Sequence, residues 1–268
     1  MKICAALVTL LAALPFAAAS RAQTCDSFVG QVVAPQSFGA AATALRAIPG
    51  VKGEFETTME FEERQRAAMG TLPSHLVIST PLDTEYIDYD ADAGRFDIRR
   101  YAVNNVNTDY ARIFGTSGAF EGVVSYSMLG VLDVVIGKTE RRTGSYRAQN
   151  AFGASTTVSE IERTTQSIYE GADTTPQHQG LFRRTPGDII WSLPISPAEA
   201  REARNQFRAA WAVVPKPPFF IEGEGRGFRA TFDVPQDVDE TLQIVVADIQ
   251  CALLLDAANT VLAAATTH

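Results

Sequence analysis

Carboxylates are the side chains of this sequence whose spacing comes closest to a catalytic pattern. They form two short clusters, one made of Glu54, Glu56 and Glu60 and the other of Asp88, Asp90 and Asp92. Two carboxylates that face each other across a cleft can hydrolyse a glycosidic bond, and Trp191 and Trp211 could stack on the sugar. The spacing selects no single pair, and helix starts and turns already account for most of these residues. A carboxylate-based hydrolase is therefore an alternative and not the first prediction.

The alternating aspartates also suggest calcium, because that ion prefers oxygen ligands. An EF-hand loop beginning at Asp88 would need Gly at its sixth position and Glu at its twelfth, where this chain has Ala93 and Arg99. An EF-hand is therefore excluded. The prediction is a solvated acidic turn, with an irregular calcium site as the alternative. The three histidines are scattered, at His75, His178 and His268. Because zinc sites and Ser/His/Asp triads need convergent imidazoles, we predict no catalytic residue, no metal ligand and no cofactor.

The first 22 residues have the pattern of a secretory signal peptide. Lys2 supplies a positive charge, an apolar run extends from Ile3 to Ala19, and small residues lead to a cleavage site after Ala22. The run falls short of the roughly 20 residues that a membrane span needs, so a membrane anchor is the weaker reading. We expect a periplasmic or secreted protein whose mature chain, residues 23–268, contains no integral membrane segment.

Two cysteines remain once Cys4 leaves with the signal peptide. In an oxidising compartment, Cys25 and Cys251 are expected to form one structural disulfide that ties the N-terminal segment to the C-terminal strands. Closing so long a loop would stabilise the fold by about 5 kcal/mol in the chain-entropy model, as an upper estimate. Two buried free thiols are the alternative.

The charge balance restricts the class of partner. The 268 residues carry 23 basic and 31 acidic side chains, and loss of Lys2 and Arg21 with the leader brings the net charge to −10. Nucleic acid is not expected as a partner, because phosphate binding needs a basic face. The partner is predicted to be an unidentified protein or small molecule.

Three segments have the pattern of helices. Residues 38–47 precede a Pro-Gly stop, and residues 58–69 follow a capping box formed by Thr57 and Glu60. A third helix is expected to begin after the N-cap Ser196, with its apolar stripe reaching Trp211 before the prolines at 215–218 end it.

Strand patterns are more numerous than helical ones. Asp90–Gly94 separates two alternating segments in the manner of a hairpin, and Gly223–Gly227 is read in the same way. The expected strands are 75–80, 86–89, 96–99, 122–129, 132–136, 155–161, 165–169, 189–193, 219–222, 228–234, 242–255 and 260–264.

Two segments carry motifs beyond this pattern. Residues 52–64 read K-G-E-F-E-T-T-M-E-F-E-E-R, and residues 146–153 read Y-R-A-Q-N-A-F-G. They resemble a K-x-E-F-E-T-x-x-x-F-E-x-R motif and a Y-x-x-Q-N-A-F-G motif of uncharacterised exported bacterial proteins. The resemblance covers roughly residues 50–160 and implies a bacterial, envelope-associated protein of unknown activity, with no catalytic residue to carry over.

The physical chemistry of both motifs favours structural roles. In the first, Arg64 lies four residues after Glu60 on the same helical face, and Phe55 and Phe61 are expected to anchor the core. In the second, Asn150 and Gly153 indicate a turn or bulge.

Short connections between strands favour antiparallel neighbours. The predicted fold class is α+β, a mainly antiparallel twisted sheet with two or three packed helices. We expect one domain over residues 23–268, with 173–187 as the one candidate internal boundary. The predicted function is that of a non-enzymatic, envelope-associated binding or structural domain. A periplasmic hydrolase is one alternative, and the other is a carrier whose long C-terminal strand lines a pocket for a small apolar ligand.

Overall fold

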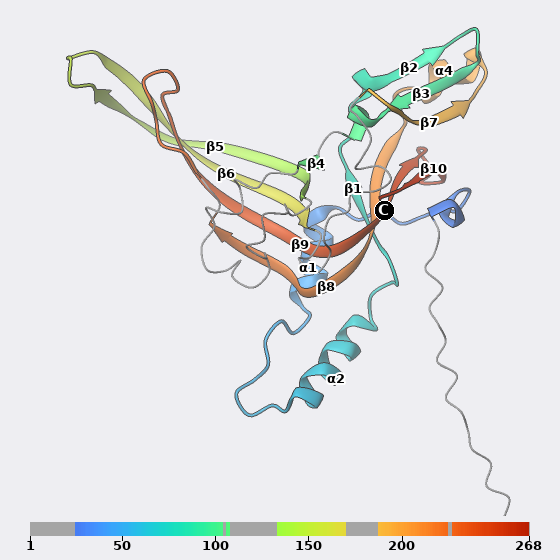
Figure 1. Cartoon of the computed structure of the whole chain (residues 1–268), viewed down its shortest axis with the longest axis horizontal. Helices are drawn as coiled ribbons and strands as arrows, with labels where there is room; N and C mark the ends of the chain where they lie inside the picture. The colour runs from blue at the N-terminus through green and yellow to red at the C-terminus, as the bar shows by residue number, and fades with distance from the viewer. Residues whose placement is uncertain (1–24, 104–105, 108–132, 170–186, 225–226, 268) are drawn as a thin grey trace, which may run out of the picture.

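The computed structural model describes residues 25–103, 106–107, 133–169, 187–224 and 227–267 (Figure 1). The predicted signal peptide, the expected strand 122–129, most of the candidate boundary 173–187, and His178 and His268 lie outside these residues. In the part of the chain that is described, no helix is long and apolar enough to cross a membrane.

The strands form two sheets, a large one of seven strands and a small one of three (Figure 1). The large sheet has the order β1 (Leu76–Thr80), β8 (Arg208–Glu224), β9 (Gln236–Leu255), β6 (Ser155–Tyr169), β5 (Asp133–Gln149) and β4 (Val106–Asn107), and β10 (Val261–Thr266) also pairs with β9. The small sheet has the order β2 (Ile87–Asp90), β3 (Arg95–Arg99) and β7 (Ile189–Pro194). The helices are α1 (Phe38–Arg46), α2 (Thr58–Met69) and α4 (Pro197–Ala203), with 3₁₀ turns η1 (Cys25–Phe28), η2 (Thr84–Tyr86) and η3 (Arg100–Val103).

The α+β class and the predominance of antiparallel pairs agree with the sequence-based expectation. The large sheet is nevertheless mixed, because β6 and β9 run parallel from Ser159 opposite Gln236 to Tyr169 opposite Val246. Parallel pairing requires a long connection, and here the chain passes through β7, α4 and β8 before it returns as β9.

The helices at the start of the chain begin and end where the sequence predicts. Ser37 caps α1, whose Phe38, Ala41 and Leu45 are buried. Thr57 caps α2 through the expected capping box with Glu60, yet α2 has no buried residue.

The helix predicted to reach Trp211 ends at Ala203, so that prediction is wrong beyond the first two turns. Its capping box at Ser196 and Glu199 is present. From Arg208 the chain forms β8, where Trp211 lies between Ile78 of β1 and Ala252 of β9. A continuous apolar run suits a strand that is buried on both faces, and pairing on both edges outweighs the local helical spacing.

Several strand boundaries also differ from the prediction. The segments 155–161 and 165–169 are one strand, β6, and β5 continues through the polar residues up to Gln149. The prolines at 215–218 cause a register shift within β8, because proline has no N–H for the ladder. Residues 228–234 are not a strand: β8 pairs with β9 instead, which leaves Phe228 a single bridge to Val238.

One core cluster takes side chains from both sheets. Phe96 of β3 meets Phe207, the residue before β8, edge to face with ring centroids 5.1 Å apart, and Trp211 and Leu254 belong to the same cluster. Cys25 and Cys251 form the disulfide expected from the sequence, with a Cα–Cα distance of 5.7 Å. It joins η1 to β9 beside a second buried cluster.

Candidate functional site

The helix α2 and the loop before it, residues 49–57, project from the rest of the molecule (Figure 1). This projection packs against the core through the partly buried Ala68 and Met69 at the end of α2, and Leu72 just after the helix packs there too. The N-terminal half of α2 therefore has little tertiary packing to hold it, and polar contacts must order the loop.

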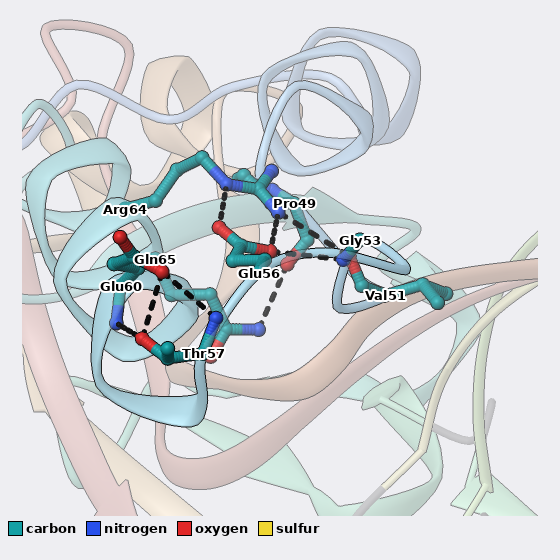
Figure 2. A network of polar contacts seen from close by, with 8 residues as sticks. All are labelled: Pro49, Val51, Gly53, Glu56, Thr57, Glu60, Arg64 and Gln65. Carbon is teal, nitrogen blue, oxygen red and sulfur yellow. Dashed lines mark hydrogen bonds and ion pairs between the residues drawn. The ribbon is translucent and has the colours of Figure 1, made fainter.

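A charged pair provides the main contact. Arg64 donates from Nε to Glu56 Oε1 at 2.8 Å and from Nη2 to Glu56 Oε2 at 2.6 Å. The backbone N–H of Gly53 donates to the same Oε2 at 2.9 Å (Figure 2). A two-pronged guanidinium–carboxylate contact fixes direction as well as distance, so Glu56 joins the loop to the helix in one geometry.

Two further contacts hold the start of the loop. Gln65 donates from Nε2 to the carbonyl oxygen of Pro49 at 2.8 Å, and Arg64 reaches the carbonyl oxygen of Val51 at 3.4 Å (Figure 2). Side chains from the second turn of α2 thus hold the loop at both of its ends.

Arg64 lies four residues after Glu60, but its carboxylate partner is Glu56. Glu60 accepts hydrogen bonds from the backbone N–H and the hydroxyl of Thr57, both at 2.8 Å. Its carboxylate is engaged in the capping box, which leaves Glu56 as the acceptor for Arg64.

These contacts set the charge of both carboxylates. Hydrogen bonds from Arg64 and from the Gly53 N–H lower the pKa of Glu56 to about 2. Hydrogen bonds from Thr57 lower the pKa of Glu60 as well. A general acid in glycoside hydrolysis needs a raised pKa, so neither group suits that role at neutral pH.

The prediction that Phe55 anchors the core is wrong. Its side chain is 93% exposed, and Val51 and Met59 are exposed on the same loop and first helical turn. Phe61 is half-buried, and the Arg64 guanidinium lies 5.5 Å from the centre of its ring. The network uses the polar side chains of the motif to hold the loop and leaves Phe55 and Met59 exposed to water.

The aspartate cluster is structural. Asp88 forms an ion pair with Arg99 at 2.9 Å, and Asp90 accepts the N–H groups of Asp92 and Ala93 in the turn of the β2–β3 hairpin. Within the described ranges, no three acidic, histidine or cysteine side chains are grouped so that they could hold a metal ion. This geometry favours the solvated turn over a calcium site.

The remaining candidates lie in the core. Trp191 and Trp211 are buried, so neither can stack on a substrate, contrary to the hydrolase hypothesis. Leu253 and Leu254 of the long C-terminal strand fill core clusters, which gives little support to a carrier. Leu255, the last residue of the same strand, borders a cavity of about 320 Å³, and the wall of this cavity also contains Arg208 and Asn259.

The second motif forms the predicted turn at the tip of the β5–β6 hairpin. Asn150 Oδ1 accepts the N–H groups of Phe152 and Ala154, both at 3.0 Å, and Gly153 has φ of +86°. The side chain of Phe152 is 97% exposed. Each motif therefore carries one highly exposed phenylalanine on an ordered turn, which no local sequence pattern reveals.

Comparisons with protein-family models, with curated proteins and with solved structures found no match for this chain. The function must therefore be argued from these residues.

Proposed function

We propose that the protein is an exported, non-enzymatic binding protein of the bacterial envelope that docks onto a partner protein through loop 49–57 and α2. The observation that carries the proposal is the 93% exposed side chain of Phe55 on a loop fixed by hydrogen bonds. Order in the free protein lowers the entropic cost of binding, and a buried aromatic anchor is the usual centre of an interface.

Two separate features support export. The leader pattern of residues 1–22 directs secretion, and the Cys25–Cys251 disulfide is typical of oxidising compartments. Mass spectrometry of the protein from its native host tests this step. A chain that begins at Gln23 is expected, whereas an intact Met1 on cytosolic protein would contradict export.

The charge of the projection indicates the chemistry of the partner. Residues 51–66 carry five acidic and three basic side chains, and Glu54, Glu62 and Glu63 are exposed beside the apolar group. A partner with an apolar pocket and a basic rim complements this surface. A second copy of the chain or an anionic lipid surface is disfavoured, because either would place negative charge against this acidic surface.

Site-specific photo-crosslinking in the native host tests the docking surface. Phe55 is replaced by p-benzoylphenylalanine, and the matched control carries the same group at Val32, which is also exposed. We expect one heterologous protein to be linked from position 55 and not from position 32. Charge reversal by Glu62→Lys with Glu63→Lys should abolish that adduct, because it removes the complementary charge.

Three outcomes would overturn the proposal. They are an adduct with a second copy only, equal adducts from both positions, and an adduct that survives the charge reversal.

A further inference from the structure

We infer that the tip of the β5–β6 hairpin binds a neutral carbohydrate. A groove of about 160 Å³ lies there, between one face of the hairpin and residues 230–232. The inference is independent of the proposed docking surface, because the two lie on different projections (Figure 1).

The floor of the groove is formed by alternate residues of the two strands. Tyr146 lies opposite Val158, and Ala148 lies opposite Thr156. Side chains two residues apart share a face of a strand, so these four belong to one face. Small side chains at Ala148 and Thr156 leave the floor open between larger neighbours.

Two aromatic rings border this floor, and one carboxylate binds both the tyrosine and the loop of the phenylalanine. Tyr146 is 42% exposed and Phe232 is 57% exposed. The Tyr146 hydroxyl donates to Asp237 Oδ2 at 2.8 Å, and the Ala230 N–H donates to Asp237 Oδ1 at 2.6 Å. Asp237 therefore fixes the tyrosine and the loop that carries the phenylalanine, which preorganises the groove.

The lining contains no charged side chain, although ion pairs lie farther down the same hairpin. Glu140 pairs with Arg163 at 2.8 Å, and Arg141 pairs with Glu162 at 2.5 Å. At the groove the polar side chains of the lining are instead neutral, with Asn150, Thr156 and Thr231 as examples. Burial of an ionic ligand without a counter-charge is costly, so the ligand is neutral.

Sugar rings fit this combination better than other neutral ligands do. Their C–H faces pack on aromatic rings, and their hydroxyl groups pair with neutral hydroxyl and amide groups such as those of Thr156 and Asn150. A peptide is usually recognised along a strand edge, whereas this groove lies on the face of the ladder. Its volume is below the roughly 300 Å³ of drug-sized sites, which suits a single ring of a longer chain.

Titration calorimetry with the full mature protein tests the inference. The probes are cellohexaose, maltohexaose and chitohexaose. Oligogalacturonate is the anionic comparator, and phosphatidylcholine vesicles test whether the tip binds a lipid bilayer instead. We expect at least one neutral oligosaccharide to bind and Phe232→Ala to weaken it about tenfold. Tyr146→Phe should weaken it less, because the ring stays while its tie to Asp237 is lost.

Phe152→Ala is the matched control, because Phe152 is exposed at the tip but does not line the groove. It should leave oligosaccharide binding unchanged. Failure of all three neutral probes to bind, or equal binding of oligogalacturonate, overturns the inference. So does vesicle binding that is lost in Phe152→Ala, since that result identifies the tip as a bilayer contact.

Discussion

The two projections of this molecule expose phenylalanine side chains by different means. Loop 49–57 is ordered by side chains, chiefly the Glu56–Arg64 pair, and its helix has no fully buried residue. The β5–β6 hairpin is ordered by a backbone ladder and by the neutral amide of Asn150. Order that depends on an exposed ion pair responds to pH and salt, whereas order that depends on backbone pairing responds to backbone conformation. Loop 49–57 should therefore lose its order when pH or salt changes, and the hairpin tip should lose its order when its backbone conformation is changed.

Substitution of one glycine in each projection should give the largest contrast. Gly153→Ala forces alanine to adopt φ of +86°, and we expect a local cost of about 1–2 kcal/mol at the hairpin tip. Gly53 has no positive φ, and a Cβ there would meet Glu56 Cβ at an ordinary 3.5 Å. Gly53→Ala should therefore stay within about 0.5 kcal/mol. Amide hydrogen exchange of residues 150–155 and 50–57 measures both effects. Equal costs would mean that backbone conformation restrains both segments alike.

The features predicted correctly are those that depend on near neighbours in the chain. Thr57 and Glu60, like Ser196 and Glu199, satisfy each other across three residues. The turn at Asn150 is equally local. These contacts form wherever the local backbone allows, so the sequence is sufficient to predict them.

The features that the sequence did not reveal depend on distant partners. Trp211 is in a strand because Ile78 and Ala252 flank it, although its own segment has helical spacing. Phe55 is exposed because the loop folds onto Arg64 and away from the core. The spacing puts Arg64 near Glu60, but Arg64 donates to Glu56 of the loop, since the capping box engages Glu60. In each case tertiary contacts decided between options that looked equal locally.

Acid should disorder the loop but not the hairpin turn. Glu56 has an ordinary pKa of 4.5 and a folded value of about 2. Because the folded value is the lower one, the contact stabilises the loop fully above pH 4.5, and this stabilisation is lost as the pH falls through about 2. NMR titration of the Glu56 carboxyl and the Gly53 amide should show this midpoint. In Arg64→Gln the midpoint should rise toward 4.5, because the largest cause of the shift is gone.

The Phe152 amide is the control in that titration, because its hydrogen bond is accepted by the neutral Asn150. It should keep its chemical shift over the pH range in which Gly53 changes. A wild-type Glu56 midpoint near 4.5 would show that the ion pair does not order the loop in solution.

Truncation of the exposed phenylalanines should have the smallest effect on stability. It tests most directly whether these rings are exposed to solvent or packed in the core. Phe55→Ala and Phe152→Ala remove rings that are 93% and 97% exposed, so each should change the free energy of unfolding by less than about 0.5 kcal/mol. Phe96→Ala, which empties a fully buried site, should cost about 3–5 kcal/mol in the same denaturation assay. If Phe55→Ala destabilised the protein by more than about 1 kcal/mol, the ring would pack in solution as the sequence first suggested. The loop would then be part of the core and not a docking surface, while the hairpin tip would keep its exposed ring.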